Sequence, residues 1–261
     1  MTNSILDLLL NRKSVRAYEA REISEQVQDE ILEATLRAPT AGNMLLYSII
    51  QVQDQNIKDT LARTCDHQPF IAKAPLVLLF LADYQRWFDY YLVSGVQELC
   101  EQNKVPMRKP EEGDLFLACC DALIAAQTAV IAAESLGLGS CYIGDIMENY
   151  EVHKELLKLP RYVFPICLVC FGYPTQGQKE RELTQRFHKK FIVFENQYQR
   201  LDRASFEEMY KDLHERTFQD RETLEGARNI GQHNYLRKFS ADFTIEMSRS
   251  VRAILAAWKE G

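Results

Sequence analysis

The sequence has no long uninterrupted apolar run. The longest, PLVLLFLA from Pro75, is too short to cross a bilayer. The first residues, MTNSILDLLLNRK, also lack the basic start and continuous apolar core of a secretory signal peptide. An excess of positive charge is absent too, since the net charge is −6, which argues against broad attraction to nucleic acid or anionic lipid. We therefore expect a cytoplasmic protein with no membrane and no nucleic-acid partner.

Several motifs that would identify a site are also missing. No G-x-G-x-x-G follows a strand and no G-x-x-x-x-G-K-[ST] occurs, so the sequence predicts neither a Rossmann dinucleotide site nor a P-loop. The histidines do not converge at a metal-ligand spacing, and we expect no metal site. CLVC at 167–170 fits C-x-x-C, but it lies inside the apolar run FPICLVCFG and predicts buried strand thiols.

The remaining composition, 46% apolar over 261 residues, is enough to bury a large core. Ser24 caps a predicted helix that Pro39 ends, and a second, alanine-rich helix is expected over 114–136 before Gly137. Strand-like segments are predicted at 46–54, 75–83, 140–145 and 162–174. Residues 195–230 are polar and helix-prone, and a closing amphipathic helix is predicted over 240–261. This alternation predicts a mixed α and β architecture whose strand order stays open.

Residues 12–16, RKSVR, place three cations and a serine around one valine in an acidic protein. They either compensate the dipole of a helix over 3–11 or hold an anion. A second basic pair, Lys179 and Arg181, follows a Gly-Tyr-Pro turn. Because Arg matches phosphate oxygens two at a time and Lys adds a point charge, the two clusters favour a bound phosphate over a charged helix end.

Further motifs accompany these clusters in a characteristic order: NRKSVRAY, ATLRAPTAGN, the Ala-rich helix running into GLGSCYIGD, VCFGYP, and Lys179-x-Arg181 ahead of VFENQY. Together, over roughly residues 3–200, they resemble the FMN-dependent nitroreductase family, most closely its NADPH-preferring nitroreductase and flavin reductase branch. The resemblance implies an α+β fold with a central, mostly antiparallel sheet flanked by helices, in an intertwined homodimer. It also implies an FMN-binding domain over 1–200 and a C-terminal helical extension over 201–261 that packs on the same domain or on the partner chain.

The resemblance assigns cofactor-binding residues as well. Those expected to hold the FMN phosphate and ribityl chain are Arg12, Lys13, Ser14, Arg16, Lys179 and Arg181. Those expected near the ring are Thr40, which would come from the partner chain, Gln68, and the segment Tyr142, Ile143, Gly144 and Asp145. Because the flavin supplies the chemistry, no protein acid, base or nucleophile is expected. Two positions depart from the family: Leu45 where Gln is frequent, and Asp145 where Gly is frequent.

The implied activity is transfer of hydride from NADPH, or from NADH, to FMN and then of electrons to a nitroaromatic, a quinone or free flavin by a ping-pong route. One alternative is a specialised relative, such as a dehalogenase or an oxidase, because the fold hosts several chemistries. A second alternative is a non-catalytic FMN carrier or redox sensor. A nucleic-acid or phosphoprotein binder that uses RKSVR is a third class, which the acidic composition disfavours.

Overall fold

A computed structural model of the chain describes residues 4–218 and 226–259. The chain divides into two compact units, one formed by Met1–Glu182 with Glu246–Gly261 and the other by Leu183–Ile245. The first unit contains the sheet and all of the expected cofactor-binding residues.

In the described residues one sheet of four strands has the order β1-β2-β4-β3, and every neighbouring pair is antiparallel. The strands are β1 (Tyr47–Gln51), β2 (Leu76–Asp83), β3 (Gly139–Ile143) and β4 (Val163–Gly172). Each lies where the sequence predicts a strand, and the antiparallel sheet expected from the family is confirmed. The spatial order could not be predicted: β3 lies at an edge, next to β4.

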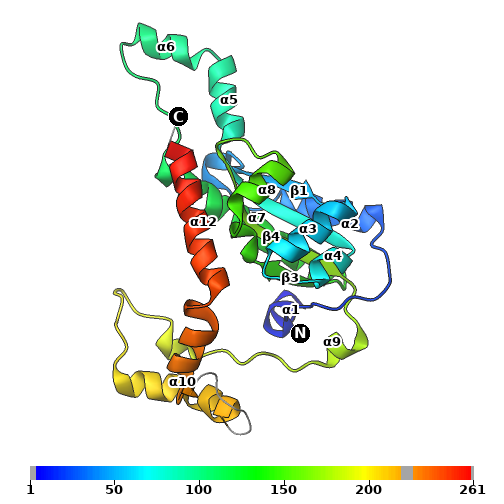
Figure 1. Cartoon of the computed structure of the whole chain (residues 1–261). Helices are drawn as coiled ribbons and strands as arrows, with labels where there is room; N and C mark the ends of the chain where they lie inside the picture. The colour runs from blue at the N-terminus through cyan, green and yellow to red at the C-terminus, as the bar shows by residue number, and fades with distance from the viewer. Residues whose placement is uncertain (1–3, 219–225, 260–261) are drawn as a thin grey trace. The chain divides into compact units, whose positions relative to one another are not determined.

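Helices cover the sheet and continue beyond it (Figure 1). Those of the first unit are α1 (Ser4–Asn11), α2 (Glu25–Thr35), α3 (Gln55–Thr64), α4 (Phe70–Lys73), α5 (Gln85–Val93), α6 (Val96–Gln102), α7 (Glu112–Ser135), α8 (Tyr150–Leu157) and α9 (Gln176–Glu180), with short turns η1 (Ala41–Asn43) and η2 (Asp145–Met147). Those of the second unit are α10 (Arg203–Phe218) and α11 (Ile230–Asn234), with η3 (Lys189–Phe191) and η5 (Tyr235–Phe239). Helix α12 (Asp242–Lys259) leads from the second unit back into the first. Part of the helix-prone stretch 195–230 falls outside the described residues.

Local sequence explains where the principal helices begin and end. The side chain of Ser24 accepts a hydrogen bond from the backbone N–H of Val27, as the predicted N-cap of α2 requires. A reciprocal capping box between Glu111 and Asp114 starts α7 slightly earlier than the sequence predicts. Gly137 follows α7 with φ of +79°, the left-handed conformation that ends a helix.

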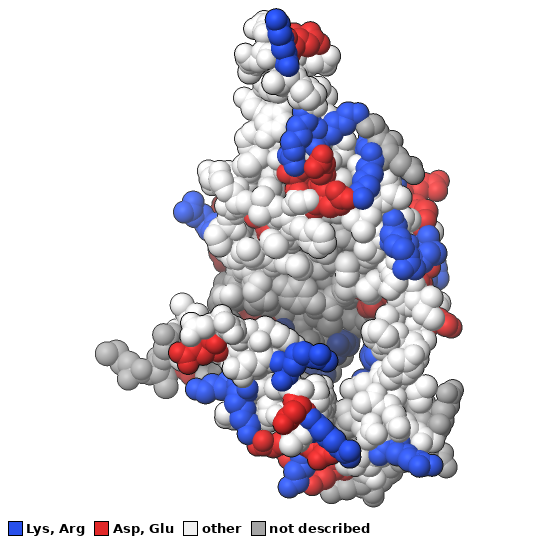
Figure 2. All heavy atoms as spheres, turned by 90° about the vertical axis from the view of Figure 1, so that its left-hand side faces the viewer, with Lys and Arg blue, Asp and Glu red and all other residues white. Residues whose placement is uncertain are grey.

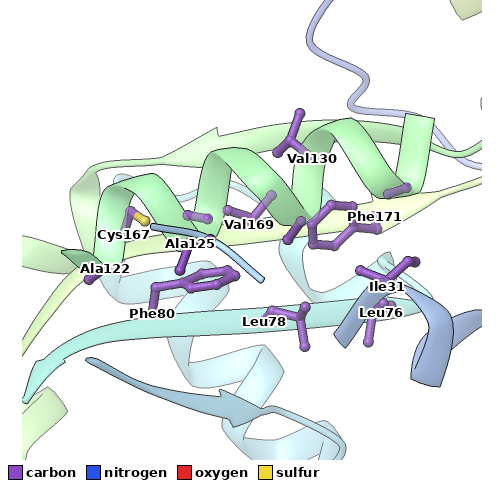
Figure 3. Packing of buried hydrophobic residues seen from close by; sticks show 14 of the residues in the cluster. Ile31, Leu76, Leu78, Phe80, Ala122, Ala125, Val130, Cys167, Val169 and Phe171 are labelled. Atoms are coloured by element: carbon purple, nitrogen blue, oxygen red, sulfur yellow. The ribbon is translucent and has the colours of Figure 1, made fainter. Parts of the chain in front are cut away.

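Helix α7 packs against one face of the sheet. Figure 3 shows Phe80 of β2 and Phe171 of β4 beside the face of α7 that carries Ala122 and Ala125. Because alanine has a small side chain, the helix axis can approach the strands closely. Among the described residues, α7 is the one helix with the length and hydropathy of a membrane span. Its packing against the strands is that of a core helix.

The opposite face of the sheet is covered by α3, α4 and η2, whose Leu61, Ile71 and Ile146 pack against Leu79 of β2. The two thiols of CLVC lie in different layers, because Cys167 packs in the α7 layer and Cys170 in this one. Both are buried, as predicted, and burial raises the pKa of Cys167 to about 12. A C-x-x-C redox pair is therefore excluded by the strand geometry.

Helix α12 lies within the predicted closing helix over 240–261 and buries apolar side chains. Ile254 and Trp258 are buried in the first unit, where the rings of Tyr162 and Trp258 meet edge to face with centroids 5.2 Å apart. The backbone carbonyl of Trp258 accepts a hydrogen bond of 2.9 Å from Arg161. Helix α12 is thereby fixed to the loop that precedes β4.

Candidate functional site

RKSVR does not continue the helix that precedes it. Helix α1 ends at Asn11, and the following residues run beside β3, where Ser14 pairs with Ser140 and the N–H of Val15 donates to the Ser140 carbonyl at 2.8 Å. A Cβ added to Gly139 would lie 2.4 Å from Cγ2 of Val15. Only glycine at the start of β3 permits this approach, so the basic segment lies beside the sheet edge and forms a single parallel bridge with β3.

The second basic cluster lies against the first. Nζ of Lys13 donates to the carbonyl of Lys179 at 2.6 Å and also to the carbonyl of Arg181. In return, Nη2 of Arg181 donates to the carbonyl of Ser14, and the N–H of Arg16 donates to Oε1 of Gln178 at 3.3 Å. Segments 166 positions apart thus meet at the start of β3, as the family resemblance implies.

The positive charge of this basic end is only partly compensated. Arg12 faces Glu134 at 3.6 Å, yet its buried Nη1 has no hydrogen-bond partner in the described part of the chain. Lys179 forms an ion pair of 2.9 Å with Glu19. Lys13, Arg16 and Arg181 have no such partner, because no carboxylate of the described residues forms an ion pair with them within 4.0 Å. Such a cluster has the donors and the charge to bind a phosphate, so the residues present fit the phosphate of FMN.

The other end of β3 carries the loop YIGD. Tyr142 and Ile143 complete the strand, the exposed Gly144 follows, and Asp145 begins η2. Nε2 of Gln68 donates to Oδ2 of Asp145 at 2.7 Å, so the structure brings these two predicted residues together. With a rise of about 3.4 Å per residue, β3 separates the basic end from this loop by about 14 Å.

The buried His153 makes hydrogen-bond contacts with the turn that follows the YIGD loop and with α3. The ring nitrogens of His153 lie 2.9 Å from the carbonyl of Ile146 and 2.8 Å from the hydroxyl of Thr64. Burial lowers the pKa of His153, so the neutral imidazole joins η2 to the end of α3. These contacts bridge distant parts of the chain, and no local sequence pattern signals them. Among the described residues, no group of three or more His, Cys, Asp or Glu is arranged to bind a metal.

Thr40 lies in a loop that is held by hydrogen bonds to α5 and α7 of the same chain. Its hydroxyl donates to the buried Asp121 of α7, which also accepts the N–H groups of Ala41 and Leu46 at 3.0 and 3.1 Å. From α5, Trp87 Nε1 donates to the Met44 carbonyl at 2.7 Å. The Thr40 hydroxyl is therefore engaged within its own chain, and the exposed residues at the tip are Gly42 and Asn43.

Leu45, one of the two departures from the family, has φ of +50°, a conformation that is uncommon for a leucine. The side chain of Arg86 donates to the Leu45 carbonyl and to the Tyr47 carbonyl. These bonds hold the left-handed residue in place. The roles of Asp121 and Arg86 could not be predicted from the sequence, because both side chains bond to backbone groups that are distant along the chain.

Comparison with known proteins identifies the family of this chain. The nitroreductase family model matches residues 9–173, and the chain belongs to the nitroreductase family. FMN reductase [NAD(P)H] of Bacillus subtilis is 31% identical over 234 residues, 88% of this chain and 91% of that protein. Oxygen-insensitive NADPH nitroreductase of Salmonella typhimurium is 30% identical over 197 residues, 76% of this chain and 75% of that protein. The structure of NfrA1 from B. megaterium superimposes with a TM-score of 0.76 at 27% identity, covering 97% of this chain and 98% of that one.

Proposed function

We propose that this chain is an FMN-dependent oxidoreductase that takes electrons from NADPH or NADH and passes them to a small acceptor such as a nitroaromatic, a quinone or free flavin. The relatives named as FMN reductase and NADPH nitroreductase support this activity. The observation that carries it is the basic end of β3, where cations from distant segments meet and where Lys13, Arg16 and Arg181 form no ion pair with a carboxylate of the described residues.

The expected cofactor-binding residues form two groups, one for each part of FMN. Those that would bind the phosphate and ribityl chain are Arg12, Lys13, Ser14, Arg16, Lys179 and Arg181. Those that would orient the ring are Thr40 of the partner chain, Gln68, Tyr142, Ile143, Gly144 and Asp145. When bound, FMN supplies the hydride and electron chemistry, so the chain's own residues bind and orient it and exclude water. The exposed Gly144 lets the backbone approach a planar group closely.

We also propose a homodimer. Several large apolar side chains face solvent in the single chain, among them Ile5 and Leu10 of α1, Phe116 of α7 and Val93 of α5. In Figure 1, α5 and α6 extend away from the sheet. A second copy of the chain that covered these surfaces would remove apolar area from water, as expected for an obligate interface.

The extension over 201–261 has a proposed role in the same assembly. Its last helix is fixed to the first unit by Ile254 and Trp258. We propose that residues 1–200 carry the FMN site and that the rest of the extension packs on this domain or on the partner chain. On the face drawn in Figure 2, basic and acidic side chains are interspersed, which supports a small-molecule partner over a polyanion. The cytoplasm is the proposed location.

Anaerobic addition of NADPH or NADH to the purified protein tests the function. A yellow protein whose visible flavin absorbance is bleached, and then restored by an acceptor, supports the oxidoreductase. A yellow protein that neither nicotinamide bleaches supports the carrier or sensor. Absence of NADPH and NADH oxidation with every acceptor in a panel of nitroaromatics, quinones and flavins would overturn the reductase assignment.

A further inference from the structure

A buried carboxyl group lies behind the YIGD loop. Glu148, which ends η2, is only 4% exposed, and its Oε1 has no hydrogen-bond partner among the described residues. The half-buried Asp145 lies at the start of the same short turn and accepts the hydrogen bond from Gln68. The turn therefore places two acidic side chains together, one bonded to a predicted ring contact and one enclosed by protein.

The groups that face this pair offer it no cation. Asp66 and the buried thiol of Cys65 come from the turn after α3, Glu246 comes from α12, and the neutral His153 comes from α8. Arg249 is bonded to Glu246 at 2.7 Å and to Glu151 at 2.8 Å. In the described chain, no Lys or Arg forms an ion pair with Asp145 or Glu148 within 4.0 Å.

Two neighbouring carboxylates cannot both stay ionised in such surroundings. Desolvation disfavours the charged form of the buried group, and a like charge beside it has the same effect. Burial, followed by the adjacent Asp145, accordingly raises the pKa of Glu148 to about 8. The buried Glu148 therefore holds a proton at neutral pH.

We propose that the buried Glu148 retains a proton beside Asp145 at neutral pH and that this acidic pair sets the charge beside the flavin ring. The proposal rests on the proposed function for the presence of the ring. With the proton in place, the pair carries a single negative charge, and Asp145 can keep its bond to Gln68. Loss of the proton to solvent adds a second negative charge at the end of β3.

The charge matters because reduced flavin is itself negatively charged around its N1 and O2 edge. A second carboxylate charge nearby disfavours the reduced form and lowers its reduction potential. Linkage requires the reverse effect, so reduction of the flavin must favour the proton on the pair. Asp145 and Glu148 would thus act as positioning and charge-setting residues, with the proton drawn from water and both electrons from the nicotinamide.

The first experiment tests the pair without FMN. Thermal unfolding of the apoprotein is followed from about pH 5 to pH 9 for the parent, for Glu148→Gln and for Glu155→Gln, an exposed glutamate of α8 that serves as the control. The parent's protonated Glu148 contributes stability that is lost as the pH rises from the ordinary value of 4.5 to about 8. The Tm of Glu148→Gln should therefore rise relative to the parent up to about pH 8 and then keep a constant difference, while Glu155→Gln follows the parent.

Parallel Tm curves for the parent and Glu148→Gln would overturn the retained proton on Glu148. If Glu148→Gln does not fold, Asp145→Asn replaces it, because removing the like charge should lower the pKa of Glu148 and weaken the same pH dependence. Neither outcome depends on whether the protein is an oxidoreductase.

The second experiment tests the coupling to the flavin. The midpoint potential of bound FMN is measured against pH for the parent, Glu148→Gln and Asp145→Asn. The parent should show a bend near pH 8, with a steeper fall just above it, whereas both variants should show no bend there. Identical slopes in all three proteins would overturn the coupling even if the pair holds a proton. A parent that binds no FMN would instead overturn the proposed function, and the unfolding data would still decide on the pair.

Discussion

The two ends of β3 differ in the sign and the environment of their charged groups: one end carries cations, and the other carries two neighbouring acidic side chains. At the first end, the cationic side chains of Lys13 and Arg181 donate hydrogen bonds to backbone carbonyls and have no carboxylate partner in the described residues, so the cluster is electropositive. At the other end, Asp145 and Glu148 lie together without a cation, and Glu148 has a raised pKa. A partly exposed cation stays charged and attracts an external anion, whereas a buried carboxylate without a partner takes up a proton. One short strand can therefore separate the proposed phosphate site, which is electropositive, from the proposed ring site, which carries an acidic pair.

The largest effect should come from removing the cations of the basic end. Arg16→Ala and Arg181→Ala should each weaken FMN binding by roughly 10- to 150-fold, since a charge-assisted hydrogen bond contributes about 1.5–3 kcal/mol. The double variant should purify mostly as apoprotein. FMN content after purification and fluorescence titration of added FMN measure the loss.

Arg203→Ala is the matched control for this prediction. Arg203 lies on α10 in the second unit and pairs with Glu207 across one helical turn, so its replacement should leave FMN content unchanged. Thermal unfolding separates lost binding from lost folding, because added FMN should restore part of the Tm by mass action. Unaltered FMN affinity in Arg16→Ala and Arg181→Ala would show that RKSVR does not hold the phosphate.

A second prediction concerns the contact that lets RKSVR lie against the edge strand β3. Gly139→Ala would place a Cβ 2.4 Å from Cγ2 and 2.8 Å from Cβ of Val15. The overlap should push the basic segment away from β3, lower stability by about 1–3 kcal/mol and weaken FMN binding. Calorimetry and FMN titration measure the two effects.

Gly113→Ala provides the comparison for Gly139→Ala. Gly113 lies in the first turn of α7 with no other group within 4 Å of an added Cβ. Alanine there should be neutral or stabilise by up to about 1 kcal/mol, because glycine is a poor helix former. If both variants unfold at the same temperature and bind FMN equally, the close packing of Val15 on β3 does not hold the segment.

Much of the fold could be predicted because its signals are local. The N-cap at Ser24, the apolar run of β2 and the glycine after α7 each act within a few residues of themselves. The basic end could also be anticipated, since both of its clusters are short runs of cations. Their meeting point could be expected only through the family resemblance, because spacing along the chain does not specify which loops converge.

The rest of the site depends on contacts that local sequence does not encode. Asp121, Arg86 and His153 act on loops far from them in the chain, through hydrogen bonds to backbone groups. Glu148 looks like any acidic residue in a polar turn until the fold shows that it is buried next to Asp145. The raised pKa of Glu148 therefore follows only from the tertiary structure.

A third prediction concerns how the stability contributed by His153, behind the YIGD loop, changes at acid pH. Because burial lowers the pKa of His153, the folded protein keeps it neutral while the unfolded chain titrates near 6.5. The stability that depends on neutral His153 is present above about pH 6.5 and is lost as the pH falls toward the lowered pKa. The Tm of the parent should therefore drop below pH 6.5.

His153→Gln isolates this contribution. It should be less stable than the parent at pH 7.5 by about 1–3 kcal/mol, because buried hydrogen bonds to Ile146 and Thr64 are disturbed. Its Tm should depend less on pH between 5 and 7 than that of the parent or of His188→Gln, which changes an exposed histidine in the second unit. Equal pH dependence in all three proteins would assign the acid sensitivity to other groups.

The smallest expected effect comes from the carboxylate that partly offsets the basic end. Glu134 lies 3.6 Å from Arg12 and accepts a hydrogen bond of 2.9 Å from the hydroxyl of Ser140, and burial raises its pKa. Glu134→Gln keeps an oxygen that can accept from Ser140 but removes the negative charge. FMN should then bind roughly two- to five-fold more tightly, a gain of about 0.5–1 kcal/mol, with the advantage narrowing at acid pH as Glu134 of the parent protonates. FMN titrations of both proteins at two pH values measure the difference. Weaker binding by Glu134→Gln would mean that the carboxylate serves chiefly to orient Arg12, and that the basic end is tuned by geometry more than by its net charge.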